Sequence, residues 1–227
     1  VLIELESYGF YFTKPDQLDV KSKAWLRHYF EEHIYPVVTP LAVDSGHPFP
    51  FLTNHTINAI VRIFQIQPDG TKDYKIAILP IPSVLDRIIE IPSRGNKEHR
   101  FVYLEDVITY YANQFFQGYG IEDYMVFRIT RDADLEIDEE EATDLLSEVE
   151  ASLRRRRRGD AVRLEVCGEV KDNLLDFVLT SVELEPKDVY RIDGHLDCRM
   201  YFNFCNYPGL DQLRYVPSVS YTHLRAH

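Results

Sequence analysis

The stretch "NAIVRIFQIQPDGTKDYKIAILPI", residues 58–81, decides the fold class of this 227-residue chain. Over residues 58–66 successive side chains alternate between two sets, with Ile60, Arg62, Phe64 and Ile66 opposite Ala59, Val61, Ile63 and Gln65. A Pro-Asp-Gly turn follows at 68–70, and a second extended run occupies residues 74–81. Two extended runs joined by a short turn predict a β-hairpin. Hairpin strands are antiparallel, so this stretch favours a mixed sheet over a doubly wound parallel one.

Helices and further strands are predicted on both sides of this hairpin. Apolar residues at helical spacing predict a helix within residues 17–34, which Pro36 ends. A short helical turn is expected within 83–92, and longer helices over 104–117 and 173–184. Extended segments are expected at 100–105, 124–129, 161–166 and 188–193. This irregular order predicts an α+β fold, with a mixed β-sheet flanked by α-helices.

A proline-rich segment, "PVVTPLAVDSGHPFPF" at residues 36–51, connects the first helix to the hairpin. Prolines at 36, 40, 48 and 50 push the residues before them toward extended geometry. We therefore expect a rigid, irregular connector with one short strand at most. It either orients a helix against the sheet or faces a ligand, and the sequence favours the first role.

The strongest helical pattern covers residues 138–158. Its apolar positions recur at steps of three and four along one stripe, formed by Ala142, Leu145, Leu146, Val149 and Leu153. The first turn is acidic, and five arginines precede Gly159 at the other end. Both charge groups oppose the helix dipole, which stabilises the ends. We predict one long amphipathic helix at about 138–158 that packs on the core through this stripe.

The five arginines, residues 154–158, support two interpretations. Successive helical residues turn by about 100°, so only two of the five could face one ligand. A pair four residues apart, such as Arg154 and Arg158, could bind a polyanion through planar guanidinium groups. Alternatively, the run only stabilises a solvated helix end. Residue chemistry favours the helix end and leaves the anion site open.

Composition excludes several classes of function. A net charge of -12 and a pI near 5.1 oppose general attraction to nucleic acid or anionic membranes, so an anion site must be concentrated. Cys167, Cys198 and Cys205 form neither a CxxC pair nor an even disulfide framework, which favours buried thiols in a reducing compartment and no zinc site. We find neither a run of about 18 apolar residues nor a secretory signal, and expect a cytosolic chain.

Residue patterns identify no catalytic or metal centre in this chain. The acids at 132, 134, 136 and 138 suggest a calcium loop, but its sixth and twelfth positions hold Ile137 and Thr143 instead of Gly and Glu. The eight histidines are scattered without HExxH spacing, and no GxxxxGK, GxGxxG or GxSxG pattern occurs. We therefore predict no catalytic residue and no metal ligand in this chain.

Several stretches together resemble one family, polyphosphate kinase. The matching stretches are "YPVVTPLAVDSGHPFPFLTN", "AILPIPSVLDRIIEIP", "FVYLEDVI", "VFRITRDADLEIDEEEATDLLSEVEASLRRRRRGDAVRLEV" and "VYRIDGHLD". They occur in order between about residues 35 and 197. The resemblance implies the head, or middle, domain of a larger phosphoprotein. That enzyme transfers the ATP terminal phosphate reversibly, through a phosphohistidine, to growing inorganic polyphosphate.

The resemblance also implies boundaries and partners. Residues 1–12 would end a preceding N-terminal domain or form the join to it, and residues 13–217 would form the middle domain. The stretch "SVSYTHLRAH" at 218–227 departs from the family and is expected to be a sequence artefact. ATP and Mg²⁺ would be bound mainly by domains outside this chain, which alone is expected to be inactive. We also expect a homo-oligomer, dimer or higher, without nucleic acid. The full enzyme would be cytoplasmic, with membrane association left open.

With the resemblance, the arginines become the candidate polyphosphate or phosphate contacts: Arg154, Arg155, Arg157, Arg158 and, on the next strand, Arg163. A different class of function remains as the alternative, namely a stand-alone anion-binding or oligomerisation module without catalysis. Flanking catalytic domains in the same reading frame would favour the kinase, and natural start and stop codons would favour the module.

Overall fold

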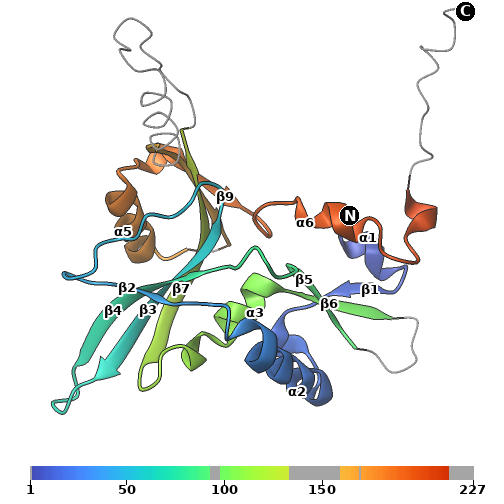
Figure 1. The fold of residues 1–227 in the computed structure, drawn as a ribbon, viewed down its shortest axis with the longest axis horizontal. Coiled ribbons are helices and arrows are strands. Elements are labelled where there is room, and N and C mark those ends of the chain that lie inside the picture. Colours follow the sequence, from blue (N-terminus) through green and yellow to red (C-terminus); the bar gives the residue numbers. More distant parts are fainter. Residues whose placement is uncertain (1, 93–97, 133–158, 169, 215–227) are drawn as a thin grey trace, which may run out of the picture. The chain divides into compact units, whose positions relative to one another are not determined.

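The computed structural model describes residues 2–92, 98–132, 159–168 and 170–214. Contacts divide the chain into two units, Val1–Leu196 and Asp197–His227. The first unit contains two β-sheets together with α1 (Leu2–Glu6), α2 (Val20–Tyr29), α3 (Leu104–Tyr110) and α5 (Asp172–Val182) (Figure 1). The second contains α6 (Met200–Phe204) and a 3₁₀ turn, Asp211–Leu213.

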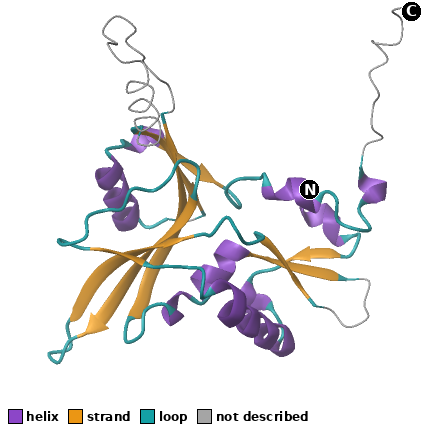
Figure 2. Ribbon diagram, viewed as in Figure 1, coloured by secondary structure: helices purple, strands orange, loops and turns teal. Residues whose placement is uncertain are grey.

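The larger sheet has six strands in the order β2-β4-β3-β7-β8-β9 (Figures 1 and 2). The strands are β2 (Leu41–Val43), β3 (Ile57–Ile66), β4 (Lys72–Pro80), β7 (Gly120–Arg131), β8 (Ala161–Cys167) and β9 (Val189–Ile192). All neighbours pair antiparallel except β8 and β9, which are parallel. The mixed sheet predicted from the sequence is therefore confirmed.

The predicted hairpin is formed by β3 and β4. Its register runs from Asn58 opposite Pro80 to Ile66 opposite Lys72. At the turn, Gly70 has a φ of +83°, a conformation that residues with a side chain rarely adopt. The Pro-Asp-Gly signal therefore marks the turn correctly. The proline-rich connector likewise contains a single short strand, β2, among its described residues.

A smaller sheet has three strands in the order β1-β6-β5. They are β1 (Phe10–Phe12), β6 (His99–Tyr103) and β5 (Ile88–Ile91). The prediction of a helical turn within 83–92 was wrong for residues 88–91. Ile89 and Ile91 are buried while Ile88 and Glu90 are not, the alternation of a strand. Four apolar-rich residues cannot distinguish strand from helix, and pairing with β6 decides between them.

Helix ends follow local hydrogen bonding. Asp19 caps α2, accepting hydrogen bonds on Oδ1 from the backbone N–H groups of Lys21 and Ser22 at 2.9 and 3.1 Å. A π-helical turn, Phe30–Ile34, continues α2 and completes the predicted helix. Short 3₁₀ turns cover Pro15–Gln17, Ala112–Gln114 and Pro186–Asp188.

The helix predicted over 104–117 is shorter than expected, and Gly120 belongs to the next strand. The α-helical part ends at Tyr110, and β7 begins at Gly120. A Cβ atom on Gly120 would lie 2.4 Å from the ring of Phe64 on β3, so this glycine lets the two strands pair. Gly120 therefore leaves room for the Phe64 ring beside β7.

The larger sheet is covered by helices on both faces. On one face, Ile60, Phe127 and Leu164 pack in a cluster with Leu174 and Val178 of α5. On the opposite face, Ala59, Val61 and Val126 share a cluster with Leu26 of α2 and Val107 of α3. Alternate side chains of the same strands therefore pack into two hydrophobic cores, one on each face of the sheet.

The predicted amphipathic helix at 138–158 lies outside the described residues. Its flanks are described and lie together: the Asp132 N–H donates to the Asp160 carbonyl at 2.9 Å. A Cβ atom on Gly159 would stand 1.9 Å from the carbonyl oxygen of Asp132. Gly159 is thus required by a close backbone approach, in addition to the helix-end role that the sequence suggested.

Candidate functional site

Arg163 lies within a charged cluster on β7, β8 and β9. In the register of these strands, Arg128 is opposite Glu165, and Glu165 is opposite Tyr190. Side chains two residues apart on a strand share a face, which places Arg163 beside Glu165. We call Arg128, Arg163, Glu165 and Tyr190 the β7–β9 charged cluster.

Glu165 is the centre of this cluster. Its Oε2 accepts from Nε and Nη2 of Arg128, while its Oε1 is 2.9 Å from Nη2 of Arg163. The Arg163 guanidinium also stacks on the Tyr190 ring, 4.0 Å from its centroid. Side-chain exposure rises from 8% for Glu165 through 18% for Arg128 to 41% for Arg163. Arg163 therefore presents the charge that solvent reaches most easily.

Among these four residues two guanidinium groups share one carboxylate, so positive charges outnumber negative charges by one. A guanidinium is planar, always charged, and matches the geometry of phosphate oxygens. Burial and stacking hold both groups in place before any anion arrives. The arrangement can therefore contact a phosphate group in an otherwise acidic chain.

Arg131 lies on the other face of the same strands, beside a cavity of about 400 Å³. Its Nε donates to the Leu52 carbonyl and its Nη1 to the Gly159 carbonyl, both at 3.0 Å, and the Phe51 ring lies 4.2 Å from the guanidinium. Burial lowers the pKa of Arg131. Asp160 and Glu183 also line the cavity, so its net charge is negative. Arg131 ties three chain segments together, and the negative charge balance of this cavity does not favour an anion.

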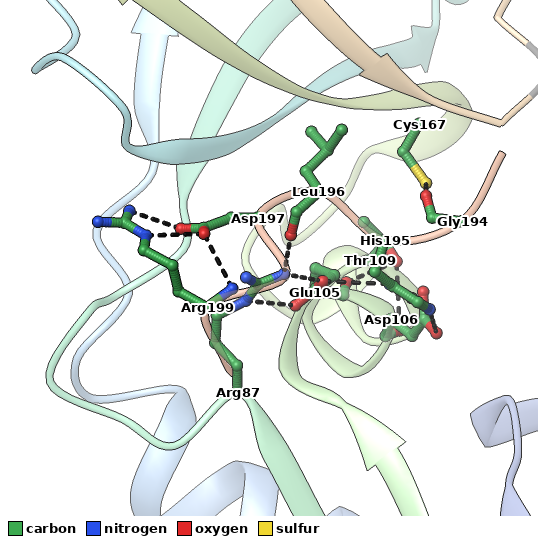
Figure 3. Close-up of polar contacts among 10 residues, drawn as sticks. All are labelled: Arg87, Glu105, Asp106, Thr109, Cys167, Gly194, His195, Leu196, Asp197 and Arg199. Atoms are coloured by element: carbon green, nitrogen blue, oxygen red, sulfur yellow. Dashed lines mark hydrogen bonds and ion pairs between the residues drawn. The ribbon is translucent and has the colours of Figure 1, made fainter. Parts of the chain in front are cut away.

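A second buried polar group centres on Glu105 of α3 (Figure 3). Glu105 is 2% exposed and forms an ion pair with Arg87, and its Oε1 lies 3.1 Å from Nδ1 of His195. Arg87 also donates from Nη2 to the Leu196 carbonyl at 2.8 Å. These contacts fix residues 195–196 onto α3. No sequence motif links residues so far apart, so the sequence did not predict this group.

Cys167, the last residue of β8, is drawn beside the Glu105 group in Figure 3. Its thiol donates to the Gly194 carbonyl at 2.8 Å (Figure 3). Burial raises the pKa of Cys167 to about 11. The thiol is therefore protonated at neutral pH, which favours a packing role over a nucleophilic one.

Acid is expected to weaken the Glu105 group. Burial by itself would raise the pKa of Glu105, but hydrogen bonds from His195 and Arg87 outweigh it and hold this pKa below its usual 4.5. The ionised carboxylate therefore stabilises the fold above its unfolded pKa, and this contribution is lost as pH falls toward the folded pKa. Melting temperatures should show Glu105→Gln less stable than the parent chain at neutral pH, with the difference shrinking in acid. A difference that stays constant into acid would contradict this role for the ionised carboxylate.

Of the five arginines predicted as phosphate contacts, Arg163 is described, and Arg154, Arg155, Arg157 and Arg158 lie outside the described residues. Sequence reasoning missed Arg128 and Glu165. The available signal was charged residues within apolar strands, one in "VFRIT" (Arg128) and two in "VRLEV" (Arg163 and Glu165). Within the described ranges, no three His, Cys, Asp or Glu side chains are grouped as metal ligands. None of the helices in those ranges is long and apolar enough to cross a membrane.

Comparison with known proteins identifies the class and then the family. A mixed α+β domain in which two guanidinium groups surround one carboxylate, in the β7–β9 charged cluster, defines a candidate anion-contacting domain. The family model described as "Polyphosphate kinase middle domain" matches residues 21–204. This chain belongs to that family, and the resemblance noted in the sequence is confirmed.

Relatives and a solved structure agree with this assignment. A polyphosphate kinase of Halalkalibacterium halodurans is 40% identical over 203 residues, and one of Pseudomonas putida is 35% identical over 218 residues. These alignments cover 89% and 96% of this chain but 28% and 30% of the relatives. The crystal structure of polyphosphate kinase from Porphyromonas gingivalis matches with a TM-score of 0.75 at 22% identity, over 96% of this chain and 30% of that one. The chain thus spans about a third of the length of its relatives.

Proposed function

We propose that this chain is the middle domain of a longer polyphosphate kinase and supports reversible transfer of the ATP terminal phosphate to inorganic polyphosphate. The family match and the partial coverage of the relatives support this role. Domains outside residues 13–217 would bind ATP and Mg²⁺ and carry the histidine that transfers phosphate. Assembly into a dimer or higher oligomer and a cytoplasmic location belong to the same proposal.

Within this role, the middle domain contributes anion contacts through Arg154, Arg155, Arg157, Arg158 and Arg163. The observation that carries this proposal is the excess positive charge of the β7–β9 charged cluster, in a chain of net charge -12. Arg163 follows Arg158 by five residues, so their Cα atoms lie within about 17 Å of each other at full extension. One linear polyanion could therefore contact both.

A titration with long-chain polyphosphate tests the arginine run. The chain should bind weakly, with affinity that falls steeply as salt rises, because bound phosphates release counterions. Arg154→Ala/Arg158→Ala should reduce the slope of log affinity against log salt by about two, if duplex DNA is a fair guide to linear polyanions. Lys21→Ala/Arg27→Ala on α2 removes the same charge elsewhere and should leave the slope unchanged. Equal slopes for both variants and the parent chain would leave the run only its helix-end role.

The alternative, a stand-alone anion-binding or oligomerisation module, predicts the same binding but no flanking catalytic domains in the reading frame. Incubation with labelled ATP distinguishes the middle domain and the stand-alone module from a chain that is itself an active kinase. The 227-residue chain alone should incorporate no phosphate, since its sequence shows no activated nucleophile. Labelled phosphohistidine on this chain would contradict the proposal that catalysis resides in other domains.

A further inference from the structure

We propose that Arg128 and Arg163 form a two-arginine phosphate contact, and that Glu165 is the positioning residue that holds it together and limits its strength. This inference rests on the proposed function, because it specifies how the middle domain touches polyphosphate. Arg128 and Glu165 are assigned here from the geometry of the strands. Arg163 thereby changes from an isolated candidate to one half of a pair.

The geometry supports a preorganised pair. Each carboxylate oxygen of Glu165 contacts a different guanidinium, Oε2 that of Arg128 and Oε1 that of Arg163. Register places Arg128 directly across from Glu165 on paired strands, and Tyr190 packs against Arg163 from β9. Both long side chains are thus ordered before a ligand arrives. Binding then loses less side-chain entropy than it would with mobile arginines.

Charge explains why the contact should be weak. A buried carboxylate needs one cation as its partner, and Arg128 at 18% exposure already meets that need. Arg163 is the second cation, and 41% of its side chain is exposed. The carboxylate competes with phosphate for the same guanidinium donors, so one net charge remains for the ligand. A polyphosphate molecule that is held by a single net positive charge can dissociate readily from this contact.

The chain offers a matched control on β3, β4 and the first residues of β7. Glu122 also lies between two cations, 3.4 Å from Nε of Arg62 and 3.7 Å from Nζ of Lys72. It is 27% exposed, accepts a further hydrogen bond from the Tyr74 hydroxyl at 2.8 Å, and is followed by Asp123. Those distances are longer and Glu122 is more exposed than Glu165, so this carboxylate holds its two cations less tightly, although Arg62 also stacks on the Tyr74 ring, 4.1 Å from its centroid. Glu122→Gln and Arg62→Gln thus repeat the same charge changes away from the β7–β9 charged cluster.

The test measures the affinity of the full 227-residue chain for linear inorganic polyphosphate at several salt concentrations. Glu165→Gln should tighten binding on the order of tenfold at about 50 mM salt and steepen the salt slope by about one, because one further phosphate charge can be neutralised. Arg163→Gln should weaken binding by a similar factor and flatten the slope by about one. Glu122→Gln and Arg62→Gln should stay within about twofold of the parent chain. A merely structural role for Glu165 would change melting temperature without changing the slope.

Different outcomes would overturn the two-arginine contact and the proposed anion contact as a whole. If Glu165→Gln fails to fold, the affinities of Arg163→Gln and Arg62→Gln are compared instead. Arg163 is substantially exposed, so its substitution should not unfold the chain. Equal effects of those two variants would overturn the inference. If the parent chain binds polyphosphate and responds to Arg154→Ala/Arg158→Ala but not to Arg163→Gln, the inference fails while the proposed contact by the run survives. If the parent chain does not bind polyphosphate at all, the proposed anion contact itself is overturned.

Discussion

Arg87→Met is expected to lower the free energy of unfolding by about 3 kcal/mol, because it removes the guanidinium partner of the buried Glu105 carboxylate and leaves it the His195 imidazole. Glu105 is 2% exposed, so water cannot replace the guanidinium. The variant also loses the hydrogen bond to the Leu196 carbonyl. Methionine keeps much of the side-chain volume, so the effect reports the charge rather than a cavity. Urea unfolding followed by circular dichroism measures the change.

Arg27→Met provides the control for this result. Arg27 also pairs with a glutamate, Glu31 at 2.9 Å, but its side chain is 64% exposed. Exposed ion pairs contribute little to stability, so this variant should remain close to the parent chain. Similar losses in both variants would mean that burial of Glu105 does not determine the energy of the Arg87 pair.

Gly159→Ala is expected to destabilise the chain by about 3 kcal/mol, at the upper end of the usual cost of overpacking. The new Cβ atom would lie 1.9 Å from the Asp132 carbonyl oxygen, so backbone must move. The movement would disturb the hydrogen bond between the Asp132 N–H and the Asp160 carbonyl, next to the paired ends of β7 and β8. Thermal unfolding should therefore shift to a clearly lower temperature.

Two glycines serve as controls for this substitution. At Gly120 the added Cβ meets the Phe64 ring, a side chain that can move, so the loss should be smaller than at Gly159. At Gly46 the nearest atom is Oδ1 of Asp44 at 3.3 Å, and the effect should be slight. A Gly159→Ala variant as stable as Gly46→Ala would contradict the close approach of residues 132 and 159.

Much of the fold follows from local patterns in the sequence. Alternation identified β3, and the extended segments expected at 74–81 and 161–166 correspond to β4 and β8. Gly70 marked the hairpin turn. The strand β5 was missed because four residues carry too little periodicity, and its conformation depends on pairing with the distant β6. The predicted helix at 138–158 stays a prediction.

The sequence by itself determined the α+β class and the hairpin, which depend on residue type and spacing. Its resemblance to a known family indicated the family and one proposed cationic contact, Arg163. Only the tertiary structure placed Arg128 opposite Glu165 and joined Arg87, Glu105 and His195. The reason is physical: strand register and helix docking bring together residues tens of positions apart, and burial then decides how strongly their charges interact.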